Sequence, residues 1–246
     1  MSGTVYLVGA GPGAVDLLTL RAARLLAHAD VVLHDALVGE DVLALAVKAK
    51  LYNVGKRANR ASVDQRFICR LLVRLAARNA IVVRLKGGDP NLFGRATEEL
   101  NVCREAGIAV VTVPGISAAF AAASSLGVSL TARGVSRSVT FVTPTVARGA
   151  ENDTHWAEAA AIAETAVIYM GALQAERVAH ALIERGVPAS RPVALIENAS
   201  TGNEHIVRGL LADLPALVSE LGDGPALMII GEAVAEAREL ARVFAA

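Results

Sequence analysis

Aromatic residues are scarce in this chain: Phe, Tyr and Trp together make up only 4% of its 246 residues. Apolar residues nevertheless account for 54% of the sequence. The hydrophobic core must therefore be built mainly from Ala, Val, Leu and Ile. The length allows either one large domain or two compact domains of ordinary size.

Cysteine, net charge and long apolar runs are also lacking. Cys69 and Cys103 lie in helical patterns without metal-ligand spacing, so we expect two buried, reduced thiols and no metal site. The 24 basic and 24 acidic residues balance, which argues against bulk attraction to nucleic acid or to an acidic membrane. No apolar run approaches the roughly 18 residues that span a bilayer, and no signal peptide is recognisable. These absences favour a soluble cytoplasmic enzyme.

Short β-branched runs alternate with longer helical patterns in the first half of the chain. This rhythm predicts a parallel sheet with helices on its faces and right-handed crossovers. The expected strands are residues 5–8, 31–34, 51–54, 81–85 and 110–113, and the expected helices are residues 16–28, 40–48, 63–78 and 92–106. Pro114-Gly115 then interrupts the pattern, and an Ala/Ser-rich helix is expected from Ser117 to about Leu126.

The second half restarts the alternation and predicts a second α/β domain. The expected strands are residues 139–142, 166–170, 193–197, 205–208 and 226–230, and the expected helices are residues 156–163, 173–185 and 210–221. Only a short polar loop precedes residue 205, so an antiparallel pair and a mixed sheet are expected there. We therefore predict two α/β domains, residues 1–114 and residues 115–246.

The loop that follows residues 81–85 is the most informative feature. Gly87 and Gly88 end an apolar strand, and Asp89-Pro90 follows directly. Paired glycines let the backbone approach a ligand that a Cβ atom would hold off, and ligands bind at the carboxyl ends of parallel strands. Lys86 and Arg95 flank the loop, so an anionic partner is expected nearby.

A second glycine-rich segment suggests a different kind of enzyme. Residues 9–14 match G-x-G-x-x-A, and Asp35 ends the second strand about 20 residues later, as in Rossmann dinucleotide-binding enzymes. Pro12 offers no backbone N–H to a pyrophosphate, however, and the helix opens later, near Asp16 and Thr19, so the turn does not lead directly into a helix N-terminus. A nicotinamide- or flavin-dependent oxidoreductase therefore remains an alternative with weak support.

Many motifs in register together resemble the uroporphyrinogen-III C-methyltransferases, from about residue 5 to residue 234. The motifs are residues 5–13, 17–20, 30–32, 35–38, 54–57, 87–90, 113–118, 138–143, 169–171 and 225–227. Several of them occur throughout the tetrapyrrole methylase superfamily, whereas 54–57 and 93–95 followed by Glu98-Glu99 are more particular to this branch. The chain has no dehydrogenase or chelatase extension, so it resembles the stand-alone form.

The resemblance implies S-adenosylmethionine as cofactor, bound in a cleft between the two domains and leaving as S-adenosylhomocysteine. The residues that match cofactor-binding positions are Pro12, Gly87, Gly88, Asp89, Leu92, Ser117, Ala118, Met170, Ala199 and Ala226. Asp35 and Lys56 match the proton acceptor and the proton donor. Arg95, Glu98 and Arg133 match positions near the tetrapyrrole. A homodimer is also implied.

The implied reaction is methylation of uroporphyrinogen III at C2 and C7 to give precorrin-2, for sirohaem or cobalamin biosynthesis. Attack by a pyrrole carbon leaves a cation that must lose a proton, for which Asp35 is the natural base. Arg95 stands among the expected catalytic residues, but because a guanidinium resists deprotonation we interpret it as a clamp on a substrate carboxylate. The sequence departs from the family pattern at Ala14, Ala36 and Ala132.

Simpler interpretations exist for single residues. Met170 alone could fill the core, and Arg95, Glu98 and Glu99 could form a solvated helix face with an i,i+3 ion pair. For the whole chain, the alternatives are another precorrin or tetrapyrrole methylase, the Rossmann-type oxidoreductase, and a catalytically inactive binding protein with the same fold.

Overall fold

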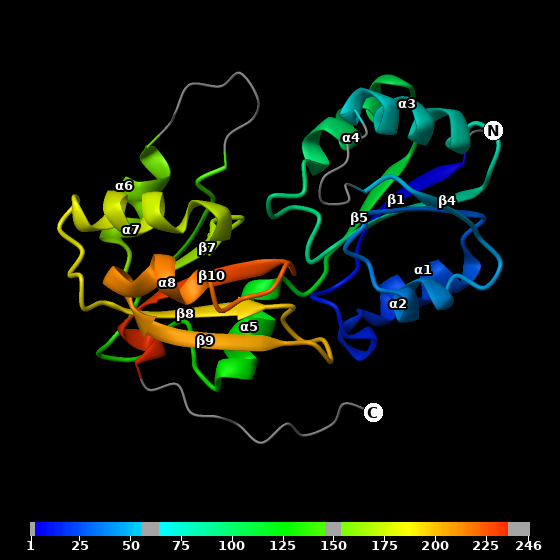
Figure 1. The fold of residues 1–246 in the computed structure, drawn as a ribbon. Helices are drawn as coiled ribbons and strands as arrows, with labels where there is room; N and C mark the ends of the chain where they lie inside the picture. Colours follow the sequence, from blue (N-terminus) through cyan, green and yellow to red (C-terminus); the bar gives the residue numbers. More distant parts are fainter. Residues whose placement is uncertain (1–2, 56–63, 146–153, 236–246) are drawn as a thin grey trace. The chain divides into compact units, whose positions relative to one another are not determined.

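The computed structural model of the protein describes residues 3–55, 64–145 and 154–235. The chain divides into two compact units, Met1–Ala118 (unit 1) and Ala119–Ala246 (unit 2) (Figure 1). The predicted domain boundary after Pro114 falls in the link that leads to helix α5 (Ala118–Leu126) and stays a prediction.

Unit 1 is built on a five-stranded sheet with the order β3-β2-β4-β1-β5. The strands are β1 (Thr4–Gly9), β2 (Val31–His34), β3 (Lys50–Asn53), β4 (Ile81–Lys86) and β5 (Val110–Val113). Every pair is parallel, so the predicted parallel sheet is confirmed. The register pairs Gly9 with Lys86 and His34 with Leu85, which brings the carboxyl ends of the strands to one edge.

All four predicted helices of unit 1 form, but three of them begin later than the periodicity indicated, and the second ends at Ala44 instead of residue 48. The helices are α1 (Leu20–His28), α2 (Glu40–Ala44), α3 (Gln65–Ala76) and α4 (Ala96–Glu105). Helix α1 starts at Leu20 because the Thr19 hydroxyl accepts a hydrogen bond from Ala22 N–H at 3.1 Å. Helix α4 cannot start at Leu92 because Phe93 and Arg95 have left-handed φ angles of 53° and 55°.

Two apolar layers cover the two faces of this sheet. On one face, Leu7, Leu33 and Val82 pack with Ile68 and Leu72 of α3 and with Cys103 of α4. On the other face, Val8, Val83 and Leu85 pack with Leu26 of α1 and Val42 of α2. Figure 1 shows α3 and α4 on one side of the sheet and α1 and α2 on the other. Both predicted free cysteines are buried.

Unit 2 contains the mixed sheet that the short polar loop predicted. Its strands are β6 (Val139–Val142), β7 (Thr165–Tyr169), β8 (Pro192–Glu197), β9 (His205–Leu210) and β10 (Ala226–Gly231), in the order β6-β7-β10-β8-β9. Strands β6 and β7 are parallel, and the other pairs are antiparallel, including β8 with β9.

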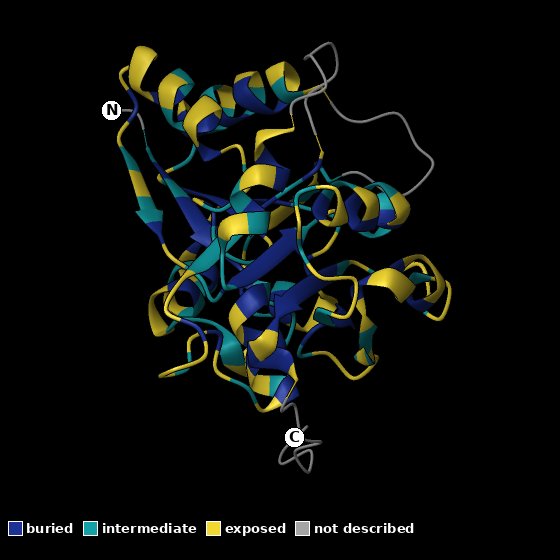
Figure 2. Cartoon of the chain, turned by 90° about the vertical axis from the view of Figure 1, so that its left-hand side faces the viewer, coloured by how far each residue is buried: buried dark blue, intermediate teal, exposed yellow. Residues whose placement is uncertain are grey.

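One face of this second sheet carries helices α6 (His155–Ile162), α7 (Ala175–Ile183) and α8 (Leu214–Val218). Trp156 is 8% exposed and lies in their common core. Phe120 of α5 contacts the ring of Phe141, whose side chain points to the opposite face. Figure 2 shows buried strands in dark blue and helices whose outer surfaces are exposed. None of the helices in the described ranges is long and apolar enough to cross a membrane.

Candidate active site

The predicted site residues of unit 1 gather at the carboxyl edge of its parallel sheet. Asp35 follows β2, Gly55 lies two residues beyond β3, and Gly87-Gly88-Asp89 follows β4. Pro12 and Ser117 lie in the segments that follow β1 and β5. Ligands of open α/β sheets bind at this edge, so the fold brings these residues together where chemistry is expected. Lys56 lies outside the described residues.

Three glycines cross in backbone contact at this edge. A Cβ atom on Gly9 would lie 2.6 Å from the backbone of Gly115 and 2.6 Å from the carbonyl oxygen of Gly88. Gly11 and Gly88 also exchange hydrogen bonds: Gly11 N–H donates at 3.3 Å and Gly88 N–H donates at 2.7 Å. Glycine is required here because the three segments pack on one another directly.

This packing argues against the Rossmann interpretation of residues 9–14. The N–H of Gly11 donates to Gly88, and the N–H of Ala10 donates to the carbonyl of Lys86 at 2.7 Å, so neither points freely toward a pyrophosphate. Strand β1 also has β4 and β5 as neighbours, whereas the Rossmann order places the first strand beside the second. Gly9 and Gly11 therefore allow close backbone packing at the carboxyl edge of the sheet and do not bind a pyrophosphate.

The backbone of the loop after β4 is not crowded by other groups, and the Asp89 carboxylate holds the loop in place. A Cβ atom on Gly87 would come no closer than 3.9 Å to another group, the Leu37 side chain, and Gly88 has a left-handed φ of 64°. Asp89 accepts hydrogen bonds from the N–H of Asn91 at 2.8 Å and from the N–H of Gly115 at 2.9 Å. The open space beside Gly87 and Gly88 can accept a ligand, and Asp89 fixes the conformation of the loop.

Left-handed backbone at residues other than glycine concentrates at the predicted site residues. Within the described ranges these residues are Phe93, Arg95, Met170, Asn198 and Ser200, with φ between 51° and 67°. Arg95 and Met170 are themselves predicted site residues, Phe93 follows Leu92, and Asn198 and Ser200 flank Ala199. Such conformations cost about 1–3 kcal/mol each and cluster at ligand sites, so these segments are candidate ligand contacts on backbone grounds as well.

Arg95 and Glu98 form an exposed ion pair at the start of α4. Nε and Nη2 of Arg95 donate to the two oxygens of Glu98 at 2.7 and 2.8 Å, and the side chains are 56% and 48% exposed. The hydrogen bond to Glu98 raises the pKa of the Arg95 guanidinium, so it stays charged. The predicted i,i+3 pair is confirmed, and the Nη1 group of Arg95 lies outside that pair.

Glu99 does not belong to this solvated face, so that part of the alternative interpretation was wrong. Its side chain is fully buried and accepts hydrogen bonds from Arg84 Nε at 3.0 Å and from Lys86 Nζ at 3.1 Å. Arg84 also binds the carboxylate of Asp35 at 2.5 Å through Nη2. The anionic partner expected for Lys86 is therefore an internal carboxylate and not a ligand.

The environment of this cluster changes the pKa values of both buried cations. Burial lowers the pKa of the Lys86 ammonium, and repulsion from Arg84 adds to this effect against the attraction of Glu99. For Arg84, burial acts in the same direction, but the carboxylates of Asp35 and Glu99 outweigh it and raise the pKa. Arg84 is thus a permanent cation beside Asp35.

Sequence reasoning overlooked Arg84 and misplaced Lys86, although a signal was present. Parallel strands are buried on both faces and read as continuous apolar runs, so a charged residue within one needs an internal partner. Arg84 and Lys86 are two residues apart and share the face of β4 that meets α4. Glu99 is the acidic residue of α4 that reaches them.

The predicted site residues of unit 2 also share one edge of their sheet. Met170 follows the end of β7, Ala199 follows β8, and Ala226 begins the antiparallel neighbour β10. Met170 is 50% exposed, so core filling does not explain it. Glu204 braces the loop of Ala199 by accepting the N–H of Ser200 at 2.7 Å. Arg133 is exposed.

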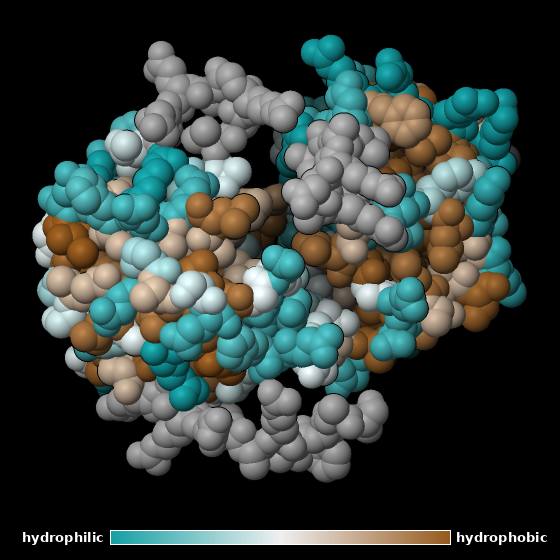
Figure 3. Space-filling view, in the orientation of Figure 1, coloured by the Kyte–Doolittle hydropathy of each residue, from teal (hydrophilic) through white to brown (hydrophobic). Residues whose placement is uncertain are grey.

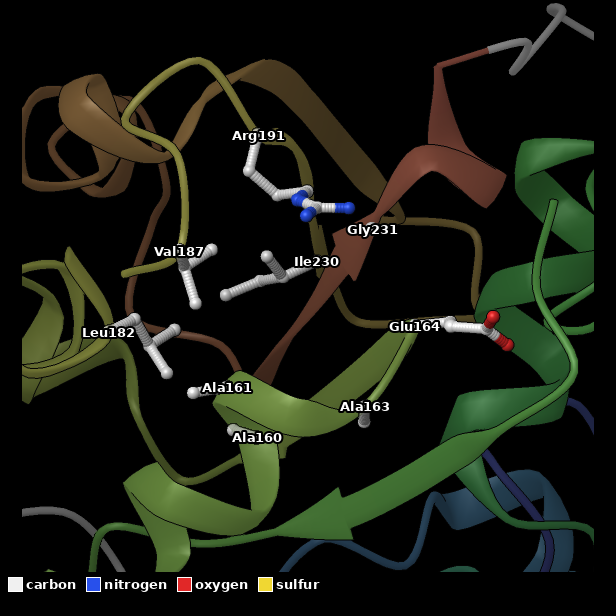
Figure 4. A pocket seen from close by; sticks show the side chains of 9 residues that line it. All are labelled: Ala160, Ala161, Ala163, Glu164, Leu182, Val187, Arg191, Ile230 and Gly231. Carbon is white, nitrogen blue, oxygen red and sulfur yellow. The ribbon is translucent and has the colours of Figure 1, made fainter. Parts of the chain in front are cut away.

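A pocket in unit 2 lies elsewhere and lacks all the predicted site residues. It is lined by Ala160, Ala161, Ala163, Glu164, Leu182, Val187, Arg191, Ile230 and Gly231 (Figure 4). Its cavity volume of about 10 Å³ suffices for one water molecule at most. In the described residues, no cluster of three or more His, Cys, Asp or Glu side chains could hold a metal ion.

Comparisons with known proteins agree with this geometry. Residues 4–215 match the family of Tetrapyrrole (Corrin/Porphyrin) Methylases. The uroporphyrin-III C-methyltransferase from Thermus thermophilus, solved with S-adenosylhomocysteine, is 39% identical with a TM-score of 0.82, over 95% of this chain and 99% of that one. A cobalt precorrin-4 methyltransferase is 26% identical with a TM-score of 0.79, over 94% of this chain and 95% of that one.

Curated relatives match at higher identity over part of their length. The sirohaem synthase of Azotobacter vinelandii is 46% identical over 234 residues, which are 94% of this chain and 50% of that protein. The sirohaem synthase of Psychromonas ingrahamii is 45% identical over 240 residues, 97% of this chain and 50% of that protein. The chain thus spans about half the length of these relatives. The family match covers most of the chain, and the chain belongs to the tetrapyrrole (corrin/porphyrin) methylases.

Proposed function

We propose that the protein is an S-adenosylmethionine-dependent C-methyltransferase that converts uroporphyrinogen III to precorrin-2, in sirohaem or cobalamin biosynthesis. The observation that carries the proposal is the carboxyl edge of unit 1, where an open glycine loop and an acidic residue held by a buried arginine lie together. Similarity to a uroporphyrin-III C-methyltransferase over nearly the whole chain supports the substrate.

The residues at this edge suit the proposed cofactor. Gly87 and Gly88 leave open backbone for close contact, and the Asp89 carboxylate has lone pairs beyond those used by Asn91 and Gly115. Bound S-adenosylmethionine would supply an electrophilic methyl group on a sulfonium sulfur and leave as S-adenosylhomocysteine. The remaining proposed contacts are Pro12, Leu92, Ser117 and Ala118, with Met170, Ala199 and Ala226 from unit 2.

Asp35 is proposed as the proton acceptor. After a pyrrole carbon of the substrate has been methylated, Asp35 takes the proton of a ring nitrogen on Oδ2: the N–H bond breaks, an O–H bond forms, and the electron pair stays on nitrogen. The side chain is 30% exposed, so its second oxygen can meet a ligand while Oδ1 stays on Arg84. Lys56 is proposed as the proton donor from the resemblance alone.

Arg95 is proposed to bind a carboxylate of the tetrapyrrole. Its pair with Glu98 uses Nε and Nη2, which orients the guanidinium and leaves Nη1 outside that pair for the substrate. Glu98 acts here as the orienting partner, and Arg133 is proposed as a second cationic contact. Arginine suits this task because its planar fork matches carboxylate geometry.

Two finer properties are also proposed: a homodimer, from the resemblance, and a cytoplasmic location, from the composition. Apolar side chains reach the surface of both units (Figure 3). The most exposed of them include Ile162 at 87% and Leu173 at 101%, and such residues are available for contact with a second copy. Light scattering of the purified protein tests the dimer: a mass near twice 25.5 kDa supports it and a mass near 25.5 kDa refutes it.

A second candidate function is methylation of another precorrin. The similarity to a cobalt precorrin-4 methyltransferase supports this alternative. Competition between uroporphyrinogen III and later precorrins for one enzyme preparation separates the two. A preference for a later precorrin would replace the proposed substrate while leaving the cofactor in place.

The test uses a methyl-labelled cofactor and anaerobically prepared uroporphyrinogen III. The wild-type protein should transfer label to the tetrapyrrole and should bind S-adenosylhomocysteine in calorimetry. Asp35→Asn should bind S-adenosylhomocysteine equally well but form product much more slowly. Binding of NADP⁺ without binding of S-adenosylhomocysteine would refute the proposal in favour of an oxidoreductase.

A further inference from the structure

A connected network of four charged side chains runs from the interior of unit 1 to the proposed active site. Glu99 Oε1 accepts hydrogen bonds from Arg84 Nε at 3.0 Å and Lys86 Nζ at 3.2 Å, and its Oε2 accepts a second one from Lys86 at 3.1 Å. Gln65 Nε2 donates to the same Glu99 Oε1 at 3.1 Å. Arg84 then reaches Asp35 at 2.5 Å.

The exposure of the charged side chains increases from Glu99 in the interior to Asp35 at the proposed active site. The side chain of Glu99 is 0% exposed, those of Arg84 and Lys86 are 3% and 5% exposed, and that of Asp35 is 30% exposed. Among these four charged side chains, the end that reaches solvent is Asp35, the proposed proton acceptor. Gln65, the uncharged partner of Glu99, is half-buried. Two cations and two anions balance, as required for charges taken out of water.

All three nitrogen positions of the Arg84 guanidinium are fixed. Nε binds Glu99, Nη2 binds Asp35, and Nη1 donates to the carbonyl oxygen of Leu85 at 3.0 Å. The plane of the guanidinium is set by the interior, so Oδ1 of Asp35 is held in one place. A single strong bond to Oδ1 directs the other oxygen, Oδ2, away from Arg84.

We propose that Glu99 and Arg84 are positioning residues for Asp35, and that Lys86 is the counter-charge that lets Glu99 remain buried. This inference rests on the proposed role of Asp35 as proton acceptor. Glu99 fixes Arg84, Arg84 fixes Asp35, and only Asp35 touches the substrate. A buried ion network is weak evidence for stability, since apolar residues often replace such networks without loss. Because this network ends at the proposed catalytic carboxylate of Asp35, we assign it a role in positioning that carboxylate.

Other charged groups near Asp35 do not replace this role. His34 precedes it on β2 and is buried, and its Nδ1 contacts the backbone carbonyl of Asp35 at 3.0 Å, not the carboxylate. Asp89 braces Gly115 and Asn91. Among the described residues, Arg84 forms an ion pair with the Asp35 carboxylate, and Glu99 and Lys86 lie behind Arg84.

The test compares Glu99→Gln in two backgrounds, the wild-type chain and Asp35→Asn. Glutamine keeps the shape of Glu99 but removes its charge. In the wild-type chain the turnover number should fall by about ten- to a hundredfold, the usual effect of removing a group that orients a catalytic one. In the Asp35→Asn background the same change should alter turnover by less than about twofold, because the residue that it positions is gone.

Two further measurements separate positioning from general damage. The affinity for S-adenosylhomocysteine should stay within about twofold, because the glycine loop does not contact Glu99. Side-chain ¹⁵N spectra should show slow rotation of the Arg84 guanidinium in the wild-type protein, and faster rotation in Glu99→Gln and in Asp35→Asn. Glu232→Gln, which removes the charge of an exposed partner of Arg191, is the matched control and should change neither readout.

Glu99→Gln leaves two buried cations against one anion and could fail to fold. The double variant Lys86→Met/Glu99→Gln restores the balance and should show the same turnover loss and the same faster rotation of Arg84. Equal losses in both backgrounds, or unchanged guanidinium rotation, would overturn the inference while wild-type activity upholds the proposed function. A wild-type protein without methyltransferase activity would overturn both.

Discussion

Gly9→Ala is expected to destabilise unit 1 because Gly9 lies where three backbone segments cross. The new Cβ atom would lie 2.6 Å from Gly115 Cα and from Gly88 O, whereas ordinary contacts begin at 3.4 Å. The segments must therefore separate by about 0.8 Å, the difference between 3.4 and 2.6 Å. All the atoms involved are backbone and cannot rotate away, so we expect a loss near the upper end of the ~1–3 kcal/mol range for overpacking.

Gly39→Ala is the matched control. Gly39 precedes α2 with a φ of −67°, and no atom lies within 4 Å of a Cβ atom placed there. Its replacement should change stability by less than about 1 kcal/mol, because alanine restricts the unfolded chain but is less favourable than glycine at the N-cap of a helix, and the two effects oppose each other. Urea denaturation of the two variants and the wild-type protein measures both effects.

The same pair of variants tests the role assigned to the glycine-rich segment after β1. Because Gly9 supports Gly88 of the neighbouring loop, Gly9→Ala should also weaken binding of S-adenosylhomocysteine in calorimetry. If Gly9→Ala proves as stable as Gly39→Ala and loses only ligand affinity, the backbone-packing argument fails. Gly9 would then serve the ligand directly, as a dinucleotide-binding glycine does.

Arg95→Ala should raise the Michaelis constant for uroporphyrinogen III while leaving S-adenosylhomocysteine affinity unchanged; an unchanged Michaelis constant and rate would count against the carboxylate clamp. A second prediction concerns alkaline pH. Burial first, then Cys69 and Glu99, raise the pKa of the Cys103 thiol from 9.0 to about 11. Between these values the unfolded chain holds fewer protons than the native chain, so the free energy of unfolding falls as pH rises, by about 2–3 kcal/mol. Cys103→Ala should flatten this slope in urea denaturation at pH 8–11; an unchanged slope would refute the assignment.

The strands were predictable from sequence because each is a short apolar run bounded by polar or glycine residues. Predicted and observed strand ends differ by two residues at most, as for β9, which continues to Leu210. The order β3-β2-β4-β1-β5 could not be predicted, because periodicity reports which face is buried and says nothing about which strand is the neighbour.

Helix starts were predicted less well, and the reason is local. The periodicity of α4 extends back to Leu92, but the backbone at Phe93 and Arg95 is left-handed, so the helix begins only at Ala96. No propensity favours that conformation in these residue types. The strain follows from the tertiary structure of the loop, so sequence pattern alone misses it.

The placement of the candidate site residues was predicted best where glycines and motif order mark the strand ends, and worst where charges are buried. Gly87, Gly88 and Asp35 lie at one edge as expected. Lys86 was expected to face an anionic ligand and Glu99 to lie on a solvated helix face, since lysine and glutamate are seldom fully buried. Their pairing depends on which helix covers β4, and that is a property of the fold. Arg84, a charged residue inside an apolar strand, was the sequence signal that a buried ion pair was present.

The most direct test of the account is the mass of the tetrapyrrole formed from uroporphyrinogen III and S-adenosylmethionine under anaerobic conditions. We expect a product that carries two added methyl groups on carbon, with two molecules of S-adenosylhomocysteine released per tetrapyrrole. Unmethylated tetrapyrrole, from a protein that binds S-adenosylhomocysteine, would contradict it.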